Sequence, residues 1–276
     1  PPLHCTDGAT VCNELIPFEP ANNPAEAGYD PMLGYIEYPE NGETWANQYR
    51  SYLRRDVVML IKYAAAKTAC AAQAWSFGNG GPLGTIDMSE ADGAIPGTSV
   101  GSPGHPSGTH TDGFDIDMAY FQVNTSDNAA RPVCDHADGG GEAYHCTAAP
   151  HLLDPWRTAM YLGTLFEHPD LRVVGVDGKV GPMVEACMDI LCDEGWLSGA
   201  ACTASQRPLA YEVTDQGWGW YLFHHHHFHV SFSQPSYKRA QSSNQRCLID
   251  GCDRAPLDAF LQARGLSTRP KLAPPR

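Results

Sequence analysis

The sequence has few positive charges and no long apolar segment. No apolar run approaches the roughly 18 residues that a transmembrane helix needs, so we expect no membrane span. Lys and Arg number 18 against 32 Asp and Glu, which gives a net charge of −14. An acidic protein is repelled by phosphate backbones, so we expect no nucleic-acid partner. The spacing of the residues does not indicate the oligomeric state.

The sequence also lacks any Cys-x-x-Cys pair among its ten cysteines. This absence argues against a zinc ribbon or a thioredoxin-type motif. An even number of cysteines scattered through loop-like segments instead indicates up to five disulfides and an oxidising compartment. Connectivity does not follow from spacing; candidate short-range pairs are Cys5–Cys12, Cys134–Cys146 and Cys247–Cys252.

No charged-then-apolar signal peptide opens the chain, which begins Pro-Pro-Leu-His-Cys. We therefore expect a secreted or periplasmic protein whose signal peptide has already been removed. Of the 276 residues, 42 % are hydrophobic and 18 % charged, which is enough apolar material for a packed core. With no internal repeat and no clean linker, residues 1–276 are expected to form a single domain. Its core would span about 44–235, with 1–43 and 236–276 as loop-rich extensions packing on it.

Hydrophobic spacing predicts an α+β fold. A small antiparallel sheet would be flanked by helices and disulfide-stabilised loops. Thr44 is a plausible helix N-cap before apolar residues at helical spacing over 45–75, and Asp154-Pro155 has the residue types that open a helix. The other expected elements are helices over 182–191 and 256–265 and strands over 83–88, 114–121, 171–176 and 221–232.

The segment from Gly108 to Asp117 is the first of two that suggest chemistry. His110 ends a Gly-rich loop, and Gly113 lets the chain turn before the strand that follows. In that strand, Asp115 and Asp117 alternate with apolar residues, so both carboxylates are expected on one face.

The second segment is His224-His225-His226-His227-Phe228-His229. His227 and His229 are two residues apart, so in a strand they point to the same face. A purification tag would explain a histidine run, but tags lie at termini and this run is internal. A nickel- or copper-sequestering tract is another interpretation, which leaves the His-Asp segment upstream unexplained.

Together the two segments offer the ligands that zinc prefers. Zinc takes about four nitrogen, sulfur or oxygen ligands in a tetrahedron, and a catalytic site leaves one position for water. A sheet that places the His227/His229 face beside Asp117 would gather three or four ligands around one zinc ion per chain, with an imidazole to spare.

The order of these motifs resembles the superfamily of lysostaphin-type peptidases, D-Ala-D-Ala peptidases and hedgehog domains, and most closely the penicillin-insensitive murein endopeptidases. The first segment resembles its His-x(6)-Asp motif and the second its His-x-His motif. Further similarities, from about residue 83 to 232, are Ile86-Asp87-Met88-Ser89, Gly104-His105, Phe114-Asp115-Ile116-Asp117 and Gly217-Trp218-Gly219-Trp220.

The resemblance implies a zinc metallopeptidase that cuts D-alanine-containing cross-links in murein (peptidoglycan), a DD-endopeptidase. By position, His110, Asp117 and His229 would bind zinc. His227 would face the reacting carbonyl, to orient water, accept its proton or stabilise the oxyanion, with His224 as a supporting catalytic histidine. His105 is a possible additional ligand, and Asp115 a group that orients a histidine.

The chain also departs from the family pattern. Four residues, Pro106 to Thr109, separate Gly104-His105 from His110, and Gly108 stands where a serine is usual. His225 and His226 have no family counterpart, and one of them is expected on the opposite sheet face.

Two alternative functions stay open at this stage. A D-Ala-D-Ala carboxypeptidase or dipeptidase of the same superfamily would need Glu-x-x-His, but His224 occupies the glutamate position and no acidic residue lies between Gly217 and His229. A non-catalytic zinc-stabilised binding module is the other, because metal can stabilise a fold without chemistry. A fourth zinc position closed by protein, for example by His105, would favour that module.

Overall fold

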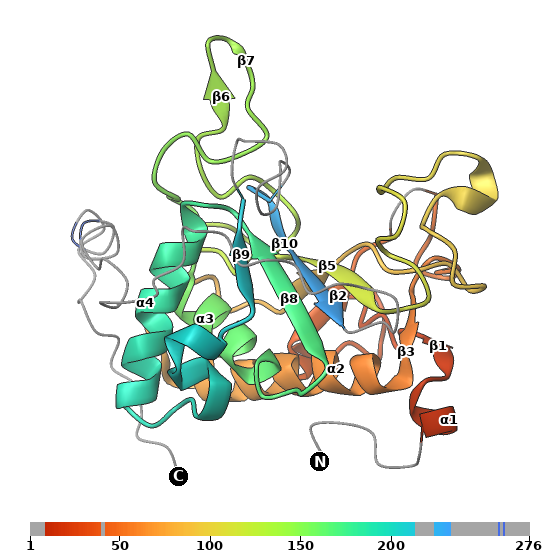
Figure 1. The fold of residues 1–276 in the computed structure, drawn as a ribbon, viewed down its shortest axis with the longest axis horizontal. Helices are drawn as coiled ribbons and strands as arrows, with labels where there is room; N and C mark the ends of the chain where they lie inside the picture. Colours follow the sequence, from red (N-terminus) through yellow and green to blue (C-terminus); the bar gives the residue numbers. More distant parts are fainter. Residues whose placement is uncertain (1–8, 40–41, 213–223, 233–258, 260–261, 263–276) are drawn as a thin grey trace.

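A six-stranded mixed sheet forms the centre of the fold (Figure 1). The structure is a computed structural model that describes residues 9–39, 42–212, 224–232, 259 and 262. The strand order is β2-β4-β5-β10-β8-β9. The strands are β2 (Tyr35–Glu37), β4 (Leu83–Thr85), β5 (Asp115–Ala119), β8 (Leu171–Val176), β9 (Leu209–Tyr211) and β10 (His227–Phe232).

The chain is thus α+β, but its sheet is not the wholly antiparallel one that was expected. The central pairs β4–β5, β5–β10 and β10–β8 are antiparallel. The outer pairs β2–β4 and β8–β9 are parallel. Strands β2, β4 and β9 have three residues each, too few to show a pairing direction in the sequence.

Three helices pack together beside the sheet. They are α2 (Arg55–Ala71), α3 (Pro155–Leu165) and α4 (Val180–Asp193), and α3 contacts both of the others. The expected start of α2 at Thr44 is wrong. The chain first forms β3 (Tyr52–Arg54), and Thr44 makes only an isolated bridge to Asn47. The helix begins where the helically spaced buried residues begin, not at the nearest capping residue.

Other predictions from the sequence are confirmed. The Asp154 side chain accepts hydrogen bonds from the backbone amides of Trp156 and Arg157 and so caps α3. Strand β8 has the expected bounds, and α4 covers the expected helix 182–191.

The two central strands have one apolar and one polar face. Met118 of β5 and Phe228 of β10 contact Tyr161 of α3, so the apolar face lies against the helices. Asp117 and His229 are on the opposite face, because side chains alternate along a strand. Both faces are buried.

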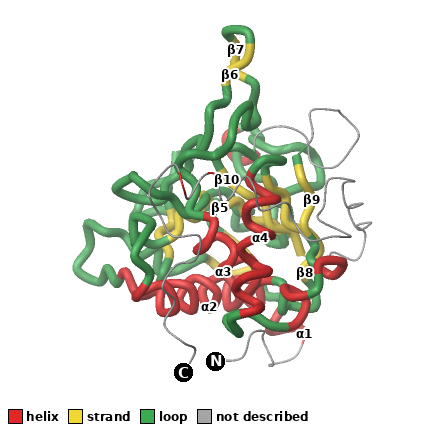
Figure 2. Tube along the Cα trace, turned by 90° about the vertical axis from the view of Figure 1, so that its left-hand side faces the viewer, coloured by secondary structure: helices red, strands yellow, loops and turns green. Residues whose placement is uncertain are grey.

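Smaller elements surround this core. Strand β1 (Leu15–Pro17) pairs with β3, and β6 (Ala137–Asp138) pairs with β7 (Gly141–Glu142) in a hairpin that projects from the body (Figures 1 and 2). The short helices are α1 (Ala9–Cys12) and the 3-10 turns Pro31–Leu33, Ala72–Ala74, Thr98–Val100, Gly199–Cys202 and Ala204–Gln206.

Two disulfides lie within the described residues. The expected pair Cys134–Cys146 is confirmed, and Cys192–Cys202 was not foreseen. Cys5, Cys247 and Cys252 lie outside the described residues, so the pairs proposed for them stay predictions.

The N-terminal and C-terminal segments were both expected to be loop-rich extensions. Segment 1–43, expected to be a loop-rich extension, contributes β2 to the main sheet. Segment 236–276, with its expected helix, lies almost entirely outside the described residues, as do Trp218 and Trp220. Within the part of the chain that the structure describes, no helix combines the length and apolar character needed to cross a membrane.

Candidate metal centre

The register between β5 and β10 assembles the candidate site. His229 is directly opposite Asp117, His227 opposite Ala119 and Ser231 opposite Asp115. Residues directly opposite in an antiparallel pair lie on the same face with their Cβ atoms about 5 Å apart. The His-x-His and Asp-x-Asp patterns therefore meet on one face, although more than a hundred residues separate them in the chain.

A strained loop brings His110 to the same face. His110 and Asp112 have positive φ angles of 51° and 56°, and Gly113 has a φ of 72°. Non-glycine residues adopt such angles at a cost, which the surrounding contacts must offset. Arg54 supplies some of these contacts: its guanidinium donates to the Asp112 carbonyl, and its backbone amide donates to the Gly113 carbonyl at 3.0 Å.

Three potential ligand atoms converge where this loop meets the strands. His229 Nδ1 lies 2.8 Å from Asp117 Oδ1 and 3.1 Å from His110 Nε2, and His110 Nε2 lies 3.4 Å from Asp117 Oδ1. Ligands at about 2.0–2.1 Å from a tetrahedral zinc ion are about 3.3 Å apart. The three atoms are therefore spaced nearly as three ligands of one tetrahedral zinc ion would be. The donor set of two imidazoles and one carboxylate also suits that ion.

The electrostatics of the triangle favour charged groups despite the burial. Burial alone raises the pKa of Asp117, but His110 and His227 beside it, together with hydrogen bonds from His110 and His229, hold that pKa well below 3.8. Burial lowers the pKa of His229, but hydrogen bonds to Asp115 and Asp117 outweigh it and raise the pKa to about 9. The two carboxylates therefore favour the protonated form of the His229 imidazole, and they would equally attract a metal cation.

Asp115 orients His229 from the other side of its ring. His229 Nε2 lies 3.2 Å from Asp115 Oδ1, and the Ser231 hydroxyl donates to the same oxygen. Arg172 in turn donates to Ser231 Oγ, at 2.7 Å from Nη2. Nδ1 of His229 is left facing Asp117 and His110. A carboxylate in this position would fix the tautomer of His229 if it binds metal, and the orienting role expected of Asp115 stays a prediction.

His105 lies next to His110. Their rings stack with centroids 3.8 Å apart. Ligand atoms of His105, His110 and Asp117 all lie within 4.8 Å of one another, although four residues separate the two histidines. Asp87 holds His105, with Oδ2 3.0 Å from Nε2. His105 is thus close enough to be a fourth ligand, and it is held by a carboxylate.

His227 borders the cluster beside Asp117. Its Nε2 lies 3.5 Å from Asp117 Oδ2, and 11 % of its side chain is exposed. Burial lowers the pKa of His227 well below 6.5, against the attraction of Asp117. Burial therefore favours the neutral form of the His227 imidazole.

His224 lies next to His227 and contacts Glu212. The ring centroids of the two histidines are 5.3 Å apart. Glu212 is buried and accepts a hydrogen bond from the His224 backbone amide at 3.0 Å, with its Oε2 3.7 Å from His224 Nδ1. His224 is thus in contact range of His227, and its expected supporting role stays a prediction.

Glu212, Ser231 and Arg172 were not predicted from the sequence. Glu212 is an isolated carboxylate twelve residues before His224, and no spacing rule connects the two. Ser231 did carry a signal, because it continues the two-residue alternation of His227 and His229. Arg172 is identifiable only from the pairing of β8 with β10.

Comparison of the chain with models of protein families finds no match. Comparison with curated proteins finds none either. The candidate site therefore depends on its own geometry and on the resemblance of its motifs.

Proposed function

We propose that the chain is a zinc-dependent murein DD-endopeptidase that hydrolyses D-alanine-containing peptide cross-links. The observation that carries the proposal is the convergence of His110 Nε2, Asp117 Oδ1 and His229 Nδ1. Murein as the substrate follows from the resemblance in motif order alone. The two disulfides support a secreted or periplasmic location, where such bonds persist.

The chain's own residues would divide the work as follows. His110, Asp117 and His229 would hold zinc, which supplies a Lewis acid that polarises a peptide carbonyl and acidifies water. His227, neutral and partly exposed beside Asp117, would take a proton from the attacking water and return it to the leaving amine. Asp115 would keep the His229 ring in the ligating orientation, and His224 would brace His227.

A zinc-stabilised binding module is the second candidate, and His105 is the observation that favours it. If His105 closes the fourth ligand position, the ion has no place for water or substrate. The hydrogen bond from His105 Nε2 to the Asp87 carboxylate is compatible with either role, because a carboxylate behind an imidazole supports both a ligand and a neighbour of the site.

The test is hydrolysis of purified cross-linked muropeptide dimers, with the products identified by mass. We expect the zinc-loaded chain to convert dimers to monomers, and chelated protein and the variant His110→Ala to lose this activity. His145→Ala is the matched control, because His145 lies in a loop and hydrogen-bonds the Ala143 carbonyl instead. Unchanged cleavage by chelated protein would refute the proposal.

The same digests separate the alternatives. Release of free D-alanine from monomers, without cleavage of dimers, would indicate the carboxypeptidase. Tight zinc binding with no hydrolysis of either substrate would indicate the binding module. In that case, His105→Ala would weaken zinc binding about as much as His110→Ala does.

A further inference from the structure

A second group of metal-binding side chains lies at the base of the β6–β7 hairpin. It consists of His136, Glu142 and His225, whose ligand atoms all lie within 4.8 Å of one another. Glu142 stands between the two imidazoles: its Oε2 is 2.7 Å from His136 Nδ1, and its Oε1 is 3.8 Å from His225 Nε2. None of these residues belongs to the candidate metal centre described above.

The backbone around this group is well fixed. His136 and Glu142 flank the turn of the hairpin, and the Ala143 amide donates to the His136 carbonyl at 2.8 Å. The Cys134–Cys146 disulfide closes the base of the hairpin. The Val133 amide donates to the His225 carbonyl at 3.0 Å, which connects the hairpin to the segment before β10.

The side chains differ in exposure in a way that suits an ion. About a third of the side chains of His136 and Glu142 is exposed, so an ion can reach them from solvent. His225 is 4 % exposed, and its Nε2 faces Glu142. A buried imidazole is costly unless its nitrogens find partners, and an ion shared with Glu142 would be such a partner for Nε2. The 3.8 Å gap to Glu142 is too long for a hydrogen bond and close to the separation of about 3.3 Å between two ligands of one zinc ion.

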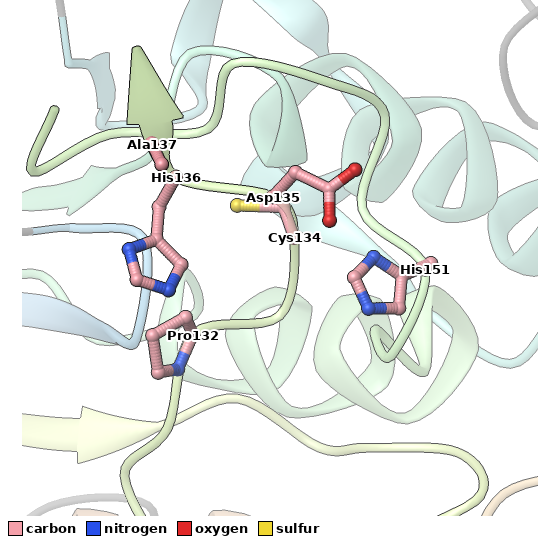
Figure 3. A pocket seen from close by; sticks show the side chains of 6 residues that line it. All are labelled: Pro132, Cys134, Asp135, His136, Ala137 and His151. Atoms are coloured by element: carbon pink, nitrogen blue, oxygen red, sulfur yellow. The ribbon is translucent and has the colours of Figure 1, made fainter. Parts of the chain in front are cut away.

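We propose that His136, Glu142 and His225 form a second zinc site, which fastens the β6–β7 hairpin to the chain leading into β10. Two imidazoles and a carboxylate are a common zinc ligand set. His136 also borders a pocket of about 490 Å³ (Figure 3). That pocket is lined by Pro132, Cys134, Asp135, His136, Ala137 and His151.

This site would give roles to His225 and His226, the two histidines of the run that have no counterpart in the family pattern. His225 would be a ligand of the second ion. The ring centroids of His225 and His226 are 4.7 Å apart, and His226 Nδ1 lies 2.8 Å from His227 Nδ1. The histidine run therefore connects the two sites through direct contacts, with His226 between them. The inference concerns binding alone and does not depend on the proposed peptidase activity.

The test is the number of zinc ions bound per chain. The full-length chain is stripped of metal and dialysed against zinc in the presence of a weak competing chelator, and the bound metal is measured by elemental analysis. We expect two ions per wild-type chain, one in His136→Ala and one in His110→Ala. His151→Ala is the matched control and keeps two, because His151 lines the same pocket but is not part of the group.

The outcomes separate this inference from the proposed function. A single ion in the wild type that His110→Ala abolishes would overturn the second site and leave the first intact. A single ion that only His136→Ala abolishes would support the second site and contradict the first. Two ions in His136→Ala would also refute the ligand assignment. Near-ultraviolet circular dichroism checks that each variant folds, which is expected most clearly for His136→Ala because the His136 side chain is partly exposed.

Discussion

His229 and Asp117 are directly opposite each other on β10 and β5, with Nδ1 and Oδ1 2.8 Å apart. This pairing brings the two motif segments into one site. A shift of either strand by one residue would turn its polar side chains to the opposite face, against the helices. Met118 and Phe228 alternate with the polar residues and pack against Tyr161 of α3, and this packing keeps the register that forms the site.

The role of Asp115 can be tested with a change that preserves its shape. Asp115→Asn removes the charge that holds His229 Nε2, and we expect zinc affinity at the candidate metal centre to fall roughly 10- to 100-fold. Affinity is measured by competition with a chelator of known strength. Asp112→Asn is the control, because Asp112 is in the preceding loop and its side chain is 59 % exposed. Equal affinities for wild type and Asp115→Asn would show that Asp115 does not orient the ligand.

The turn before β5 should tolerate no side chain at Gly113. Gly113 has a φ of 72°, and an added Cβ would lie 2.8 Å from the Arg54 nitrogen and 2.9 Å from the Leu53 carbonyl carbon. We expect Gly113→Ala to lower the free energy of unfolding by more than the roughly 1–3 kcal/mol that a strained φ costs, and to weaken zinc binding by displacing His110. Chemical denaturation and zinc titration measure the two effects.

Gly101 is a matched control for this prediction. Its φ of 74° is nearly the same, but no atom lies within 4 Å of an added Cβ. Gly101→Ala should therefore show the cost of the backbone angle without the steric clash, and it should bind zinc normally. If the two variants are equally stable and bind zinc equally, the close packing around Gly113 does not position His110.

Alternation made the polar face of each central strand predictable from the sequence. Asp115 and Asp117 are on one face of β5, and His227 and His229 on one face of β10, as the two-residue spacing requires. That the two faces adjoin was expected only from the resemblance in motif order. Strand pairing between segments this far apart depends on tertiary packing, which local spacing does not encode.

Other features had no local signal at all. Glu212 is a lone carboxylate in a loop-rich segment, and its contact with His224 depends on the parallel pairing of β9 with β8. Thr44 shows the opposite error, because a capping residue and helically spaced apolar residues were present in the sequence, but the chain forms β3 before α2 begins at Arg55. Burial determined where the helix begins.

A buried carboxyl outside the candidate site predicts how stability changes with pH. Glu37 in β2 is fully buried, and burial raises its pKa from 4.5 to about 8. A raised folded-state pKa contributes stability that is complete below pH 4.5 and is lost as pH rises toward 8. Glu37→Gln removes the proton equilibrium, so its stability relative to wild type should increase by about 1.4 kcal/mol per pH unit in this window.

Denaturant unfolding at pH 5, 6.5 and 8 measures this effect. Glu26→Gln is the control, because the Glu26 side chain is exposed and the substitution removes the same charge. We expect its stability relative to wild type to stay nearly constant over the same range. A Glu37→Gln difference that does not change with pH would contradict the assignment of a protonated buried carboxyl.

The two described disulfides allow the hairpin site to be tested separately from overall stability. Cys134–Cys146 and Cys192–Cys202 span 12 and 10 residues, so loop-closure entropy predicts a similar stabilisation of about 3 kcal/mol for each. The double variants Cys134→Ala/Cys146→Ala and Cys192→Ala/Cys202→Ala should therefore lose comparable unfolding free energy. Only the first releases the base of the β6–β7 hairpin, so only it should lose the zinc ion assigned to His136, Glu142 and His225. Both variants should keep the ion at Asp117 and His229. Loss of the hairpin ion from both double variants would mean that general destabilisation, and not the geometry of the hairpin, governs that site.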